Sequence, residues 1–83
     1  MNLKNLRYLE QIVLLEEEGV KGIVADSVAE RLPFTVEATR HAIRILADKE
    51  LVEVEGKKPK ILNSTELGRL VIRLFQPQNE DVI

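Results

Sequence analysis

The sequence predicts a small, mainly helical domain that carries one β-hairpin, and two observations support this prediction. Between residues 28 and 52 a short amphipathic segment, VAERL, is interrupted by Pro-Phe and resumes at Thr35 as a longer one. Two helices joined by so short a turn cross steeply and leave one face of the second exposed. Apolar and charged residues then alternate in LVEVE, which is the period of a half-buried strand. We therefore expect the order helix, connector, helix, helix, hairpin, helix.

Length and composition are typical of a single globular domain. The chain has 83 residues, of which 45% are hydrophobic and 31% charged, and its net charge is −2. No apolar run approaches the roughly 20 residues that span a bilayer, and the N-terminal residues do not have the pattern of a signal peptide. Because cysteine is absent, disulfides and cysteine-based metal sites are excluded. We expect a cytoplasmic protein without a cofactor.

The first helix is expected over residues 2–18, where leucine and isoleucine recur at three- and four-residue spacing. Gly19 should end this helix. The three glutamates before it, residues 16–18, are interpreted as a solvated helix end, because cations suit a helix C-terminus better. Residues 20–24 are short, β-branched and flanked by glycine. They predict either an extended connector or a third, edge strand.

The second and third helices are expected over residues 24–32 and 36–50. Pro33 removes Leu32 from α geometry and ends the second helix, and Thr35 is a good N-cap for the third. At 100° per residue, one side of the third helix should face the core and the other should face outward. The expected core side consists of Ala38, Thr39, Ala42, Ile43 and Leu46. The expected outer side consists of Val36, Glu37, Arg40, His41 and Arg44.

The hairpin and the last helix follow from the remaining sequence. Residues 51–55 predict one strand, Gly56-Lys-Lys-Pro a turn, and residues 60–62 the returning strand. Asn63 or Ser64 is expected to cap a last helix that ends near Phe75. We expect one domain over residues 1–76 and a flexible tail over residues 77–83.

With this order of elements, the chain resembles the winged helix-turn-helix family of prokaryotic transcriptional regulators. It resembles in particular the small regulators of the multiple-antibiotic-resistance and phenolic-acid-decarboxylase repressor types. The matching stretches lie within residues 20–75: VAERL, the helix start at Thr35, ADKELVEVE before the hairpin and STELGRLVIRLF after it. One departure is Pro33, at a turn position that the family often fills with glycine. The resemblance implies a winged helix-turn-helix fold with the hairpin as its wing.

The resemblance implies sequence-specific binding of double-stranded DNA by a small transcriptional regulator. The helix at 36–50 would enter the major groove, and the basic wing at 56–60 would contact the backbone or the minor groove. The candidate DNA contacts are Thr35, Val36, Glu37, Arg40, His41, Arg44, Lys57, Lys58 and Lys60. Two ordinary interpretations stay open. The arginines can be solvated charges that pair with nearby carboxylates along the helix, and the lysines can protect an edge strand from aggregation.

The terminal helices carry more apolar surface than a core of this size is expected to bury. In the resembled families, helices outside the reading motif form a twofold dimer, so we expect a homodimer that binds a pseudo-palindromic site. Its two reading helices would lie about 34–36 Å apart. The candidate interface residues are Leu3, Leu6, Leu14, Leu70, Ile72 and Leu74. The alternative is that these side chains pack the core of one monomer.

The alternative function is a winged-helix module that binds other proteins without contacting DNA. The pI of about 5.4 and the position of Glu37 on the outer face favour this alternative. Enzymatic activity is not expected, since the sequence has no nucleophile–base spacing and no glycine-rich phosphate loop. His41 is the single histidine and has no suitable neighbours, so no metal site is expected.

Overall fold

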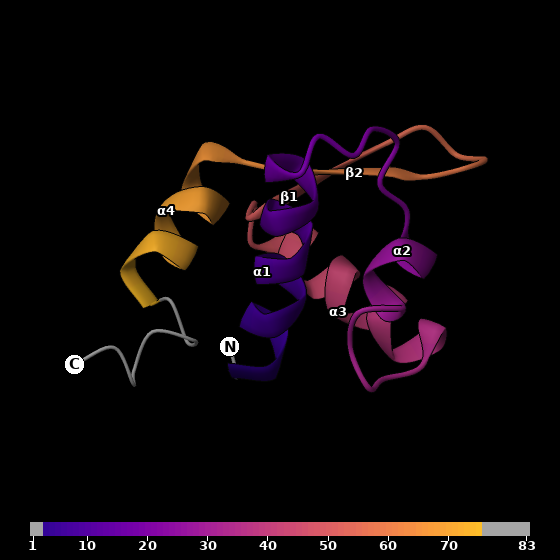
Figure 1. The fold of residues 1–83 in the computed structure, drawn as a ribbon, viewed down its shortest axis with the longest axis horizontal. Coiled ribbons are helices and arrows are strands. Elements are labelled where there is room, and N and C mark those ends of the chain that lie inside the picture. The colour runs from indigo at the N-terminus through magenta and orange to yellow at the C-terminus, as the bar shows by residue number, and fades with distance from the viewer. Residues whose placement is uncertain (1–2, 76–83) are drawn as a thin grey trace.

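The computed structural model describes residues 3–75 as a small α+β domain of helices with a two-stranded antiparallel sheet (Figure 1). The elements are α1 (Leu3–Glu17), α2 (Ala25–Ala29), α3 (Val36–Asp48), β1 (Val52–Glu55), β2 (Ile61–Ser64) and α4 (Glu66–Phe75). The expected tail at residues 77–83 lies outside the described residues. In the described part of the chain, no helix is long and apolar enough to cross a membrane.

Gly19 ends α1 as the sequence predicts. Its φ of +84° is a left-handed conformation that favours glycine, and its N–H donates to the carbonyl of Glu16 at 3.0 Å. Residues 20–24 then form a connector, which is the first of the two expected forms. It contacts the hairpin through the N–H of Leu62, which donates to the carbonyl of Ile23 at 2.8 Å. No third strand is found in residues 3–75.

The helix α2 is shorter than the sequence predicts, and α3 begins where expected. After Ala29 the backbone hydrogen bonds tighten into turns, with the N–H of Leu32 donating to the carbonyl of Ala29 at 3.2 Å. This tightening ends the helix before the proline does. Thr35 is the N-cap of α3, since its hydroxyl accepts from the N–H of Ala38 at 3.0 Å.

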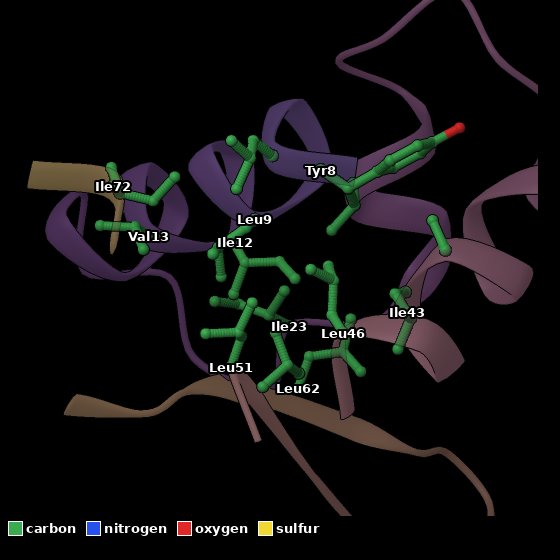
Figure 2. Close-up of a cluster of buried hydrophobic side chains, with 14 of the residues drawn as sticks. Tyr8, Leu9, Ile12, Val13, Ile23, Ile43, Leu46, Leu51, Leu62 and Ile72 are labelled. Atoms are coloured by element: carbon green, nitrogen blue, oxygen red, sulfur yellow. The ribbon is translucent and has the colours of Figure 1, made fainter. Parts of the chain in front are cut away.

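The core lies around α1, which packs against α3, the hairpin and α4. Leu9, Ile12 and Leu46 are fully buried, and Figure 2 shows Ile12 and Leu46 close to Leu62 of the hairpin, while Ile72 of α4 lies beside Val13. The expected core side of α3 is confirmed. Thr39, Ala42, Ile43 and Leu46 are buried and Ala38 is half-buried. On the outer side of α3, Glu37, Arg40, His41 and Arg44 are exposed, and Val36 is half-buried.

The hairpin runs two residues further than the sequence predicts, because β2 continues to Ser64, which pairs with Val52. Asn63 and Ser64 therefore belong to the sheet, and the expectation that one of them caps α4 is wrong. The cap is Thr65, whose hydroxyl accepts from the N–H of Gly68 at 2.9 Å. The same hydroxyl donates to the carbonyl of Glu50 at 2.7 Å. Thr65 thus ties the start of α4 to the end of α3.

The interpretation of residues 16–18 as a solvated helix end is wrong for Glu16. The carboxylate of Glu16 accepts from the N–H of Ser64 at 2.8 Å and also from its hydroxyl. Glu18 binds the guanidinium of Arg31, with Nη1 at 2.8 Å from Oε2. The hydrogen bond from Arg31 lowers the pKa of Glu18 below its ordinary value. Glu16 therefore has tertiary partners on the hairpin, whereas Glu18 is exposed and paired with Arg31.

Glu50 closes α3 in a left-handed conformation, with φ of +62°. Its N–H donates to the carbonyl of Ala47, and the N–H of Leu51 donates to that of Leu46, which is the Schellman pattern. Side chains with a Cβ are strained in this conformation. We expect Glu50→Gly to raise the free energy of unfolding by about 0.5–1 kcal/mol. Urea denaturation measures the change. Lys49→Gly is the control and should destabilise, because the φ of Lys49 is an ordinary −94°.

Candidate nucleic-acid interface

A basic hollow lies between the start of α2, the second half of α3 and the hairpin, with a volume of about 620 Å³. Arg40 and Arg44 line it from α3, and Lys57, Lys58 and Lys60 line it from the tip of the hairpin. Its walls are otherwise largely apolar, formed by Val24, Ala25, Ile43, Ala47, Val54, Pro59 and Leu62. The hollow therefore presents five exposed cations around an apolar surface, which suits an anionic partner.

Two segments that are separate in the sequence supply these cations. Arg40 and Arg44 lie one helical turn apart, so they project from the same side of α3. The hairpin carries its lysines on residues 57–60, at the end of the sheet that projects beyond α2 (Figure 1). Gly56 starts this tip with φ of +78°, and a Cβ there would lie 3.1 Å from the carbonyl oxygen of Pro59. Glycine thus permits the tight turn that exposes the lysines.

The structure brings five of the nine expected DNA contacts together in the basic hollow. Glu37 and His41 are exposed on α3 but do not line it. Val36 is half-buried. Thr35 is exposed, and its hydroxyl serves the backbone as the N-cap. These four residues stand outside the hollow, toward the N-terminal end of α3.

Two carboxylates also line the hollow, Asp26 from α2 and Asp48 from α3. Arg40 pairs with Asp26, with Nη2 at 3.7 Å from Oδ1. Both side chains are mostly exposed, so this pair contributes little to stability. The sequence suggested Glu37 or Asp48 as partners along the same helix. Asp26 was missed because the crossing of α2 over α3, rather than helical spacing, places it beside Arg40.

A second group of cations, which the sequence did not suggest, lies at the N-terminal end of α3. The ring of Phe34 directly precedes the N-cap Thr35, and Lys4 Nζ lies 4.4 Å from its centroid. The guanidinium carbon of Arg7 lies 5.6 Å from the same centroid. Tyr8 packs on the ring at a centroid distance of 5.5 Å. We call Lys4, Arg7 and Phe34 the Phe34 cluster. Phe34 is about thirty residues from both cations, so no local pattern could reveal the cluster.

The expected dimer residues fall into two groups. Leu6 and Ile72 are buried in the core of the single chain, and Leu14 is half-buried. Leu3 and Leu74 are exposed by 70% and 73%, and Leu70 is exposed by 46%. With Leu67 and Phe75, which are also exposed, Leu70 and Leu74 form an apolar face on α4. This apolar face of α4 has no cover in the described part of the chain.

Other ionisable groups do not form a second site. Within residues 3–75 there is no cluster of three or more histidine, cysteine or acidic side chains that could hold a metal ion. Glu10 is a nearly buried carboxylate on α1 and does not line the basic hollow. Burial raises its pKa above the ordinary value, and the nearby Arg7 partly offsets this effect.

Comparison with family models and with curated protein sequences gave no match. Among solved structures, the fold is similar to that of AF1382 from Archaeoglobus fulgidus, known from a high-resolution crystal structure. The TM-score is 0.81, and the match covers 93% of this chain and 85% of that chain. The sequence identity is 18%, so the likeness concerns the fold alone.

Proposed function

We propose that this chain is a winged helix-turn-helix protein that binds double-stranded DNA as a transcriptional regulator in the cytoplasm. In this proposal α3 enters the major groove and the hairpin is the wing. The observation that carries it is the convergence of Arg40 and Arg44 with the lysines of residues 57–60 on one hollow. Arginine is the commonest side chain to read guanine, and lysine neutralises phosphate. The basic hollow therefore joins a base-reading helix to a backbone contact.

The four expected contacts outside the hollow have separate roles in this proposal. His41 faces the groove from the middle of α3, where it meets base edges or phosphates. Glu37 is suited to accept a hydrogen bond from cytosine. Val36 is suited to contact a thymine methyl group, and Thr35 a phosphate. Both carboxylates in the hollow repel phosphate, which confines the backbone to the lysine side.

A salt titration tests the proposal. Fluorescence anisotropy with a labelled random duplex should show binding at about 50 mM salt, and a slope of log K against log salt of about −4 to −5, as expected for four to six phosphates. Lys57→Ala/Lys58→Ala should make that slope shallower by about 2 and weaken binding at least tenfold. Lys21→Ala, outside the hollow, is the control and should change the slope least. Absent binding at low salt, or an unchanged slope in the double variant, contradicts the proposal.

A second candidate function is a winged-helix module that binds another protein. Asp26 and Asp48 in the hollow favour it, as does the net charge of −2, because both weaken attraction to a polyanion. Under this alternative, the wild-type chain would not bind the duplex at about 50 mM salt in the titration above. The same experiment therefore separates the two functions.

We also propose that the protein is a homodimer formed through the apolar face of α4. Charge complementarity supports a second copy as the partner. Glu66 and Arg73 are both exposed and lie two helical turns apart, so they share one edge of the face. In an antiparallel pair of α4 helices centred near Leu70, Glu66 of each copy meets Arg73 of the other. Such a twofold would present two α3 helices to a pseudo-palindromic site.

Sedimentation equilibrium tests the dimer at micromolar concentration. We expect twice the 9.5 kDa mass of one chain, and Leu70→Glu should leave a folded monomer. Glu66→Arg should weaken the dimer about tenfold, because two rim pairs become repulsive. Adding Arg73→Glu to Glu66→Arg should restore the affinity. A wild-type species of 9.5 kDa, or a charge swap without recovery, contradicts this arrangement.

A further inference from the structure

We infer that the Phe34 cluster is a second phosphate-binding contact, which holds the DNA backbone at the N-terminal end of α3. This inference rests on the proposed function, and it adds Lys4 and Arg7 of α1 to the DNA-binding surface. Neither residue lies in the reading helix or in the hairpin. The partner is the sugar–phosphate backbone of duplex DNA, so the contact would be independent of base sequence.

The position of the cluster follows from its aromatic ring. Phe34 directly precedes Thr35, whose side chain caps α3, so the ring is fixed at the start of that helix. Tyr8, which is only 1% exposed, packs against the ring and ties it to α1. Lys4 and Arg7 lie within 4.4 and 5.6 Å of its centroid. Two exposed cations are therefore held beside the end of α3 that is expected to enter the groove.

The aromatic contact also orients the two cations. Each lies within the distance at which a ring face attracts a positive charge. This attraction limits the conformations of two long side chains, so they lose less entropy when they meet a phosphate. Both remain exposed, which leaves their charged groups accessible. The N-terminal end of α3 adds its own partial positive charge and N–H donors nearby. Two carboxylates oppose these groups, Glu37 in the first turn of α3 and Glu10, which interacts with Arg7.

The basic hollow and the Phe34 cluster lie at different places around α3, which suits the two sugar–phosphate backbones that border a major groove. The turn that carries Phe34 and the start of α1 lie along the lower edge of Figure 1, and the hairpin tip lies at the upper right, with α3 between them. A helix in the major groove has a sugar–phosphate backbone on each side. We assign the basic hollow to one backbone and the Phe34 cluster to the other. Two separated contacts would fix the orientation of α3, which one contact cannot do.

The test compares the salt dependence of four chains on the same random duplex. Lys4→Gln/Arg7→Gln should make the slope of log K against log salt shallower by about 2 and weaken binding at 100 mM salt at least tenfold. Lys4→Arg/Arg7→Lys keeps both charges and should retain the wild-type slope. Lys57→Ala/Lys58→Ala reports on the hollow, and the wild-type chain is the reference. If Lys4 and Arg7 only held the ring of Phe34 in place, Lys4→Gln/Arg7→Gln would alter the stability, measured by urea denaturation. The slope of log K against log salt would then be unchanged.

The outcomes separate this inference from the proposed function. If the wild-type chain binds DNA and only Lys57→Ala/Lys58→Ala weakens the binding, the contact at the Phe34 cluster is overturned and the contact at the basic hollow stands. In that case Lys4→Gln/Arg7→Gln would bind like the wild type. Absent binding by the wild-type chain would overturn both. If the double glutamine variant is less stable, Lys4→Gln alone should still make the slope shallower by about 1, since Lys4 is exposed on the first turn of α1. An unchanged slope in that variant also overturns the inference.

Discussion

Gly68→Ala is expected to lower the free energy of unfolding by about 3 kcal/mol, the upper range for overpacking a core. A Cβ at residue 68 would lie 2.2 Å from the carbonyl oxygen of Leu51 and 3.3 Å from Cδ1 of Leu9. The first atom belongs to the backbone and cannot rotate away. The carbonyl of Leu51 also accepts from the N–H of Thr65 at 3.1 Å, which fixes α4 beside it. The helix must therefore move, or its cap must break.

The sign of this effect opposes helix propensity, which favours alanine over glycine by about 1 kcal/mol inside a helix. Urea denaturation of the variant gives the change in free energy. Glu17→Ala, at an exposed position on α1 outside the proposed dimer face, is the control and should change stability by no more than about 0.5 kcal/mol. An alanine variant as stable as the wild type would show that α4 is not held against Leu51. Because the apolar face of α4 would move with the helix, the variant should also weaken the proposed dimer.

Glu16→Ala should lower the free energy of unfolding by about 2–3 kcal/mol, since it removes two hydrogen bonds to a charged acceptor. The N–H and hydroxyl of Ser64 both donate to this carboxylate, and Ser64 is buried. Arg69 Nη1 donates to the carbonyl of Ser64 at 2.9 Å and to its hydroxyl oxygen at 3.0 Å. The substitution would leave the N–H of Ser64 buried without its acceptor, at the point where α1, β2 and α4 meet.

The neighbouring Glu17 provides a matched control, because it is exposed and no hydrogen bond ties it to the hairpin within the described residues. Glu17→Ala should change stability by less than about 0.5 kcal/mol. A double-mutant cycle with Ser64→Ala isolates the hydroxyl part of the Glu16–Ser64 interaction, because the backbone N–H remains, and should give a coupling of about 1–2 kcal/mol. Equal stability of the Glu16 and Glu17 variants would contradict the assigned role of Glu16.

Local patterns were sufficient to predict the helices, the hairpin and the two sides of α3. Thr35 and Gly19 were predicted correctly because capping depends on a few adjacent residues. The cap of α4 was assigned one or two residues too early. The sequence around Ser64 offers several good caps in a row, and pairing with β1 determines which of them remains free. That choice depends on residues about ten positions away.

For the candidate site, too, some features were predictable from local patterns and others were not. Periodicity placed Arg40 and Arg44 outside the core, and the turn sequence exposed the lysines of residues 57–60. Their convergence on one hollow, the pairing of Arg40 with Asp26, and the Phe34 cluster were not predictable from local patterns. Each depends on how two elements cross. Only the tertiary structure showed which of the expected dimer residues are buried. Leu6 and Ile72 pack in the core of one chain, and Leu70 and Leu74 remain exposed.

The sequence by itself determined the order of elements, the outward face of α3 and the basic character of the hairpin tip. These properties follow from backbone preferences and hydrophobic periodicity, which act over a few residues. The tertiary structure decided which charges meet, which leucines remain exposed and where α4 begins. Such contacts join residues far apart in the chain, and their geometry depends on the packing of α1 against α2, α3, β2 and α4. For this reason the basic hollow and the Phe34 cluster became visible only in the folded chain.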